Sequence, residues 1–199
     1  MGDKGVRTKV MILDGAVRLA SELGLEGLSI GRLADELDLS KSGLFAHFDS
    51  KEDLQVQVLD RAAERFADVV VRPALAVEAG EARLRALFEH WLAWPRKVKQ
   101  PGGCVFMAAA AELDDRPGQA RDRLVALQKE WLATIARVFR RGQDVGVFRR
   151  DLEPAQVAFE FLGIGMSCHF AARLLRDPRA VEHARAALER LVLDARQRS

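Results

Sequence analysis

The sequence predicts an all-α protein of about nine helices. Apolar residues recur at three- and four-residue spacing along most of the 199 residues, and no segment shows a convincing alternation of polar and apolar residues. Glycine and proline separate the periodic stretches, as they do between helices. Because 49% of the residues are hydrophobic, the chain can bury a substantial core. We therefore expect two helical regions, a head of residues 1–53 and a C-terminal domain of residues 54–199.

The head is predicted to contain three helices. The first runs over about 9–23 and ends at Gly24. The second follows Ser29, whose hydroxyl is suited to cap a helix, and ends before Asp38, a residue type that tolerates a left-handed backbone. The third is expected over about 40–48. Two short helices joined by a tight turn are an arrangement with which proteins read the major groove of DNA.

The C-terminal domain is predicted to begin with a long helix over about 51–71, opened by a capping pair of Ser50 and Asp53. The basic, turn-rich segment 96–103 is expected to be a solvated connector. Apolar periodicity and the positions of proline and glycine predict five more helices, at 81–94 (stopped by Pro95), 104–113, 119–141, 154–176 and 178–195 (with Asp177 as its N-cap).

The run FAHFDSKE at 45–52 is the most specific motif of the chain. Together with the helix before it and the serine that opens the second helix, it makes residues from about Arg7 to Leu59 resemble the N-terminal DNA-binding domain of the tetracycline-repressor (TetR) family. Phe45 stands where this family usually has tyrosine, so we interpret it as a packing residue. The resemblance implies a three-helix head with a helix-turn-helix, followed by a helical domain for effector binding and dimerisation.

The resemblance also implies that the recognition helix and the start of the next helix contact double-stranded DNA, through Ser40, Lys41, Ser42, His47 and Lys51. We add Arg7, Thr8, Ser29, Arg32 and Gly43 to the expected contact face. Bulk charge does not predict this function, because residues 1–53 hold seven Lys/Arg against ten Asp/Glu and the whole chain has a net charge of only +2. We expect acids such as Asp14, Glu22 and Asp35 to face elsewhere, leaving a locally positive, salt-sensitive face.

Trp, Phe and Met are concentrated in the C-terminal region. Such residues at helical spacing are most often core, and a buried histidine is the simpler interpretation of His169. The family resemblance nevertheless implies a ligand pocket here, for which a small, largely apolar effector is expected. The candidates for its lining are Phe88, Trp91, Cys104, Met107, Trp131, Met166, His169 and Phe170.

The last two helices are candidates for a homodimer interface. They interleave small and apolar residues, a pattern that permits close helix–helix approach, and the alternative is an ordinary intrachain bundle. Members of the TetR family dimerise through two C-terminal helices. The candidate interface residues are Ala155, Ala158, Phe159, Leu162, Gly163, Ala184, Leu188 and Leu191.

Other classes of function find little support. Cys104 and Cys168 show no metal-ligand spacing and are expected to be buried hydrophobes, and no cofactor is predicted. No catalytic motif is present, so an enzyme is the weakest hypothesis. Without an apolar segment of spanning length or a secretory signal, we expect a cytoplasmic protein that has no membrane partner.

These observations favour a ligand-responsive, homodimeric transcriptional repressor that binds a palindromic operator. A transcriptional activator of the same fold is the alternative within this class. A helical protein-interaction module without an effector is the alternative from another class. The sequence does not identify the effector, the operator or the regulated genes.

Overall fold

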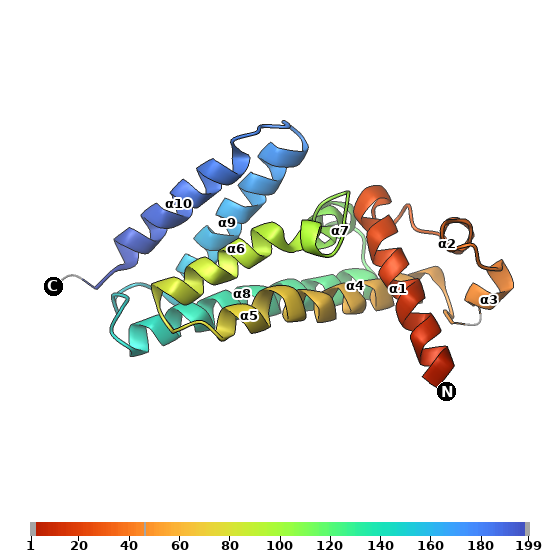
Figure 1. The fold of residues 1–199 in the computed structure, drawn as a ribbon, viewed down its shortest axis with the longest axis horizontal. Helices are drawn as coiled ribbons and strands as arrows, with labels where there is room; N and C mark the ends of the chain where they lie inside the picture. Colours follow the sequence, from red (N-terminus) through yellow and green to blue (C-terminus); the bar gives the residue numbers. More distant parts are fainter. Residues whose placement is uncertain (1–2, 46, 198–199) are drawn as a thin grey trace. The chain divides into compact units, whose positions relative to one another are not determined.

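The computed structural model describes residues 3–45 and 47–197, and these residues form a helical structure without a β-sheet (Figure 1). The elements are α1 (Asp3–Leu23), α2 (Ile30–Leu37), α3 (Lys41–Phe45), α4 (Lys51–Phe66), the π-helical η1 (Ala67–Val71), α5 (Arg72–Leu75), α6 (Glu81–Lys97), α7 (Val105–Leu113), α8 (Gln119–Asp144), α9 (Pro154–Arg173) and α10 (Ala180–Ala195). Because α4, η1 and α5 follow without a break, the described residues contain nine continuous helical segments. The predicted fold class is confirmed. None of these helices is long and apolar enough to cross a bilayer.

The chain divides into two compact units. Unit 1 holds the residues up to Phe66 together with Pro95–Leu127, and unit 2 holds Ala67–Trp94 and the residues from Gln128 onward. The predicted boundary at residue 53 divides the chain by function, into a DNA-binding head and a domain for effector binding and dimerisation. This functional boundary stays a prediction. Packing divides the chain differently, because it places α7 and the first part of α8 in the same unit as the head.

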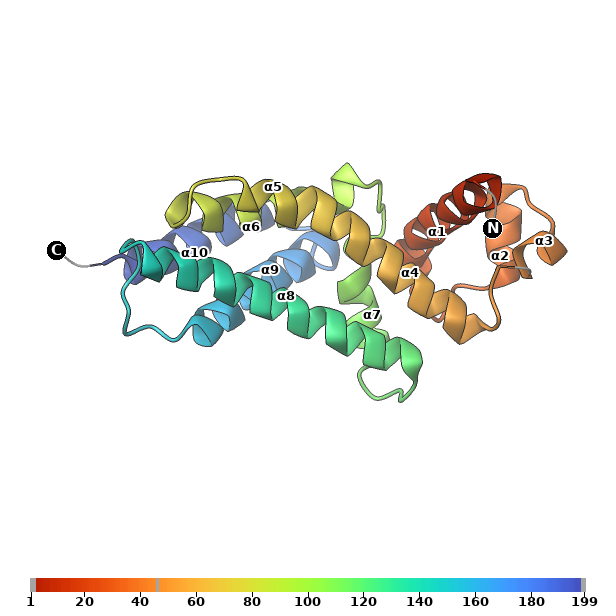
Figure 2. The ribbon, with the colours of Figure 1, turned by 90° about the horizontal axis from the view of Figure 1, so that it is seen from below.

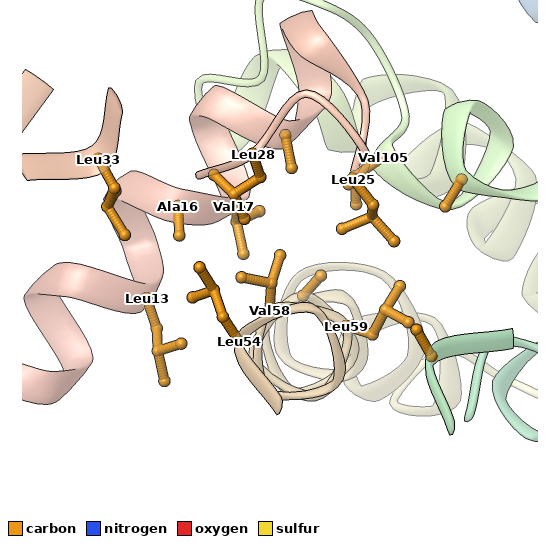
Figure 3. Packing of buried hydrophobic residues seen from close by; sticks show 14 of the residues in the cluster. Leu13, Ala16, Val17, Leu25, Leu28, Leu33, Leu54, Val58, Leu59 and Val105 are labelled. Atoms are coloured by element: carbon orange, nitrogen blue, oxygen red, sulfur yellow. The ribbon is translucent and has the colours of Figure 1, made fainter. Parts of the chain in front are cut away.

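Unit 1 is built around an aliphatic core. In this core α1 packs against α2, α4 and α7, and α2 packs against α3 (Figures 1 and 2). Figure 3 shows the leucine, valine and alanine side chains of α1, α4 and the α1–α2 turn pointing toward one another. Leu25, Leu28, Leu33, Leu54 and Leu59 are fully buried there. Burying this apolar surface is the main force that holds the head on α4.

Unit 2 has an aromatic core. Phe88 and Trp91 of α6, Trp131 of α8 and Phe161 of α9 are buried with ring centroids 5.1–6.3 Å apart, as close as aromatic pairs usually pack. A second buried pair, Phe139 and Phe148, stacks at 4.6 Å. Helices α9 and α10 lie side by side (Figure 1).

Several element boundaries differ from prediction, each for a local reason. Helix α3 ends at Phe45 rather than Phe48, because the His47 N–H donates to the Leu44 carbonyl at 2.9 Å and closes a turn. Helix α6 continues past Pro95 to Lys97, because a proline in the last turn removes only one N–H from the helix. Helix α9 ends at Arg173, three residues before the predicted end.

Helix α10 begins at Ala180, later than predicted. Asp177 does not cap an α-helical first turn. Its Oδ1 accepts the Arg179 N–H at 2.8 Å, and its carbonyl accepts the Ala180 N–H at 3.2 Å. Pro178 therefore lies in a tighter turn before the helix.

The segment 96–103 is not the predicted solvated connector. Val98 and Gln100 are buried, and Gln100 Oε1 accepts the N–H of Val105 at 3.3 Å. A Cβ at Gly102 would lie 1.5 Å from the carbonyl oxygen of Ser21, so this glycine packs directly on the backbone of α1. The segment is a packed part of unit 1.

Candidate nucleic-acid interface

The helix-turn-helix is fixed by caps at both ends of α2. Ser29 has an extended backbone, and its Oγ accepts the N–H of Arg32 at 3.3 Å. Asp38 adopts the left-handed conformation with φ 53°, and its N–H donates to the Ala34 carbonyl. Both predictions from the sequence are confirmed. The chain therefore reverses between α2 and α3 without needing a glycine.

Helix α3 presents a short polar surface. Ser40, Lys41, Ser42 and Gly43 are exposed, while Leu44 is fully buried and holds the helix on the head. Ser40 Oγ accepts the Gly43 N–H at 3.1 Å, so this hydroxyl caps the helix. Small side chains on an exposed helix allow the backbone to come close to a DNA groove.

His47 and Phe48 continue this surface beyond α3. His47 is half-buried, and its ring packs edge-on against Phe48 at 6.4 Å. The ammonium group of Lys9 lies 6.0 Å above the Phe48 ring, which brings a basic residue of α1 beside the end of the recognition segment. Phe45 is predicted to be a packing residue, but its side chain lies outside the part of the structure that is described.

The other predicted contacts come from α1 and α2. Arg7 and Arg32 are exposed and Thr8 is half-buried. A Cβ at Gly31 would be 3.8 Å from Lys41 Cε, so Lys41 of α3 lies against the start of α2.

The acids of the head are partly neutralised by nearby arginines. Asp14 accepts from Arg61 at 2.8 Å and from Arg65 at 3.3 Å. Glu36 pairs with Arg18. Arg61 and Arg65 lie outside residues 1–53, so their pairs with Asp14 offset part of the negative charge that composition alone assigns to this segment, whereas Arg18 is already counted in it. A net charge of −3 is therefore compatible with a locally positive surface.

Lys51 opens α4 and is tied to the α1–α2 turn. Ser50 Oγ accepts the Asp53 N–H at 3.0 Å and Asp53 Oδ2 accepts the Asp49 N–H at 3.1 Å, which confirms the predicted capping pair. Lys51 Nζ donates to the Glu26 carbonyl at 2.8 Å and to Glu26 Oε2 at 3.3 Å, yet 49% of its side chain stays exposed.

Sequence reasoning missed the polar residues around Glu26. Its carboxylate also accepts from Gln55 at 3.2 Å and lies 3.4 Å from Arg116. The hydrogen bond from Gln55, with those from Lys51 and the charge of Arg116, holds the pKa of Glu26 below its usual value. These residues are far apart in the chain, so no local pattern links them.

The candidate ligand residues are not all brought together. Phe88, Trp91 and Trp131 meet in the aromatic core of unit 2, where Phe161, passed over as a candidate, stacks on Trp91. Cys104 and Met107 belong to unit 1. Their roles in ligand binding stay predictions.

The other three candidates lie on α9. Met166 and Phe170 are exposed on the surface. His169 is half-buried, and burial, followed by the charge of Arg173, lowers the pKa of its imidazole. Both cysteines are buried, as predicted. The described residues contain no group of three or more His, Cys, Asp or Glu placed to hold a metal ion.

The candidate dimer residues fall into two groups. Ala158, Ala184 and Leu188 are buried within the chain, and their roles in an interface stay predictions. Phe159, Gly163 and Ala155 are exposed, and Leu162 and Leu191 are half-buried. Phe159, Gly163, Met166 and Phe170 share one face of α9 by their spacing. Beside this face a groove runs between α9 and α10, lined by Gly163, Ser167, Ala187 and Leu191 among others.

A capped helix-turn-helix on a helical second unit defines a helical DNA-binding regulator, and comparison with known proteins agrees. Residues 12–58 match the model of bacterial regulatory proteins of the tetR family, and residues 80–188 match that of the tetracyclin repressor-like C-terminal domain. The chain belongs to the TetR family of transcriptional regulators.

Individual relatives are distant. The transcriptional repressor AcnR of Corynebacterium glutamicum is 38% identical over 35% of this chain and 37% of its own, so the chain spans little more than a third of that relative. The transcriptional repressor NicS of Pseudomonas putida is 27% identical over 82% of this chain and 75% of its own. A transcriptional regulator from Saccharomonospora viridis, solved in complex with choline, is 25% identical with a TM-score of 0.78, covering 94% of this chain and 96% of that chain.

Proposed function

We propose that this chain is a homodimeric transcriptional repressor that binds operator DNA through α3 and the start of α4. The observation that carries this proposal is the capped helix-turn-helix with its exposed run Ser40, Lys41, Ser42 and Gly43. Two such heads would enter successive major grooves of a palindromic site, about 34–36 Å apart. The similarity to the repressors AcnR and NicS favours repression over activation.

Lysine substitutions test the DNA-binding face. We expect Lys41→Ala and Lys51→Ala to weaken binding to a duplex that the wild-type protein selects from random-sequence DNA. For Lys51→Ala the slope of log affinity against log salt should fall by about 0.9, the value for one lost phosphate contact. Lys129→Ala, an exposed lysine in the unit 2 part of α8, is the matched control. Unchanged binding by both head variants, measured by fluorescence anisotropy at two salt concentrations, would remove the proposed face.

The exposed side of α9 supports a dimer. Phe159, Met166 and Phe170 are 68%, 52% and 54% exposed, and such a row of large apolar side chains is unusual on a free surface. A second copy of the same helices would cover it and form a bundle across a two-fold axis. Such a dimer would bring two heads to one DNA site.

Charge introduced on this row tests the dimer. Phe159→Glu should give a monomer by light scattering at micromolar concentration and should abolish high-affinity operator binding, because one head makes only half of the contacts. Val145→Glu is the control, since Val145 is also an exposed apolar residue of unit 2 but lies in the turn just after α8. A Phe159→Glu protein that stays dimeric would place the interface elsewhere.

The aromatic core of unit 2 is the proposed effector region. Its stacked Trp91 and Phe161 rings are buried, with Gly165 against Trp91, so a small, largely apolar molecule would bind there in a conformation that opens this packing. The choline complex of the S. viridis relative supports a ligand site in this fold. An effector that fits a conformation with the wrong head spacing would lower DNA affinity.

A fluorescence screen tests the effector. A bound compound should change tryptophan emission, and it should bind the DNA complex more weakly by the same factor by which it weakens DNA binding. Trp91→Phe should reduce its affinity. If no bound compound alters DNA affinity, the proposal of a ligand response fails, while that of DNA binding stands.

A further inference from the structure

The turn between α1 and α2 is held from two sides by unit 1 itself. On one side, Glu112 of α7 accepts the N–H groups of Leu25 at 2.7 Å and Glu26 at 3.2 Å, both through Oε2. On the other side, α4 holds the carbonyls of the same two residues. Gln55 Nε2 donates to the Leu25 carbonyl at 3.0 Å, and Lys51 Nζ donates to the Glu26 carbonyl at 2.8 Å. Three successive peptide groups, from Gly24 to Gly27, are thus fixed between α7 and α4.

Gly24 makes room for the carboxylate of Glu112. Its backbone has φ +76°, a conformation that favours glycine, and a Cβ there would lie 1.4 Å from Glu112 Oε1. The first N–H groups after this glycine point at the carboxylate, as backbone N–H groups do toward bound anions elsewhere. Glu112 therefore occupies a site that the turn is shaped to provide.

We propose that Glu112 is a positioning residue for DNA binding, because it holds the backbone N–H of Glu26, the residue whose carbonyl anchors the Lys51 ammonium at the start of α4. The proposal rests on the proposed contact of Lys51 with a DNA phosphate. An ammonium has three N–H donors. The Glu26 carbonyl and carboxylate take two of them and leave one, on a half-exposed side chain, for a phosphate. A lysine that is already ordered loses less conformational entropy when it binds.

Whether DNA binding becomes weaker or stronger when Glu112 is removed distinguishes a positioning role from a purely electrostatic one. Removing a negative charge from a DNA-binding unit normally strengthens binding, because the phosphates then meet less repulsion. If Glu112 positions Lys51, its removal weakens binding. Gln is the matched control, because it loses the same charge but keeps one carbonyl oxygen that can accept both N–H groups.

The experiment measures binding to the duplex selected by the wild-type protein, with the full chain. We expect Lys51→Ala to weaken binding about tenfold, as for a lost hydrogen bond to a charged group. Glu112→Ala should weaken it about threefold to fivefold, and Glu112→Gln by less than about twofold. The double variant Glu112→Ala/Lys51→Ala should bind no more weakly than Lys51→Ala alone, because both changes remove the same contact. The salt slope of Glu112→Ala should move toward that of Lys51→Ala.

Each result decides between distinct conclusions. If Lys51→Ala binds like the wild type, the proposed phosphate contact fails, and the positioning role fails with it. If Lys51→Ala weakens binding but Glu112→Ala does not, or if the two losses multiply, the phosphate contact stands and the positioning role is overturned. If Glu112→Ala does not fold, Glu112→Asp replaces it. Asp keeps the charge but is one methylene too short, so it should weaken binding as Ala would, and wild-type binding by Glu112→Asp would overturn the proposal.

Discussion

The two units of this protein are stabilised differently. The buried core of unit 1 is leucine, valine, alanine and isoleucine with one buried phenylalanine, Phe48, among the described residues. Unit 2 buries Phe88, Trp91, Trp94, Trp131, Phe139, Phe148 and Phe161. Aliphatic side chains in fixed rotamers define backbone positions closely, as a head that reads DNA requires. Large flat rings instead provide broad apolar surfaces, which suits the proposed effector region.

The long-range polar contacts of the two units also differ. In unit 1, Glu112, Gln55, Lys51 and Glu52 bind backbone N–H or carbonyl groups of other segments, beside side-chain ion pairs such as Arg61 with Asp14. In unit 2, the long-range polar contacts include three arginine–carboxylate pairs between side chains, such as Arg85 with Glu189. A contact to the backbone fixes the path of the chain, whereas a contact between two side chains leaves the path free to shift. The comparison therefore predicts that unit 1 tolerates backbone changes poorly where these contacts are made, and that the ion pairs of unit 2 respond to pH and salt.

The largest effect is expected from Gly102→Ala. Its Cβ would lie 1.5 Å from the Ser21 carbonyl oxygen and 2.5 Å from the Glu22 nitrogen, so the backbone itself must move. We expect the free energy of unfolding to fall by about 3 kcal/mol. Hydrogen exchange should quicken first in unit 1, at α1 and α7. The control is Gly5→Ala, because a Cβ at Gly5 meets nothing within 4 Å.

A different outcome would break the comparison. If Gly102→Ala leaves thermal unfolding unchanged, the segment 96–103 is a solvated connector after all. If exchange quickens equally in unit 2, the two units do not respond separately.

The head could be predicted from the sequence because its signals are local. The Ser29 cap, the turn at Asp38 and the capping pair of Ser50 and Asp53 each involve residues within a few positions of one another. The caps and turn chemistry of a short stretch are therefore readable without the rest of the fold.

The contacts of Glu112 and Gly102 could not be predicted in this way. Glu112 reaches residues 86 and 87 positions away, and nothing in the Ala-rich helix around it marks a backbone contact. Gly102 looked like an ordinary turn glycine, because the close approach to Ser21 depends on tertiary packing. Tertiary packing also decides that Met166 and Phe170, two candidates for the pocket lining, lie on the surface. Residue type alone does not show which face of α9 is covered.

The smallest effect is expected from acid titration of an ion pair in unit 2. Arg85 donates to both carboxylate oxygens of Glu189, at 2.7 and 2.8 Å, and these bonds hold the pKa of Glu189 below its usual value. A lowered pKa means that the unfolded chain takes up this proton at a higher pH than the folded chain. The stabilisation is therefore complete above about pH 4.5 and is lost as the pH falls through the folded pKa.

Glu189→Gln should flatten this pH dependence. At neutral pH it should cost only about 0.5 kcal/mol, because nearly half of the Glu189 side chain lies in water, where solvent screens the pair. Thermal unfolding measured between about pH 7 and about pH 3 gives the difference in stability between the two proteins. That difference should shrink in about 1 M salt, where the Debye length is about 3 Å. If the variant instead loses stability more steeply with acid than the wild type, side-chain ion pairs are not what makes unit 2 sensitive to pH.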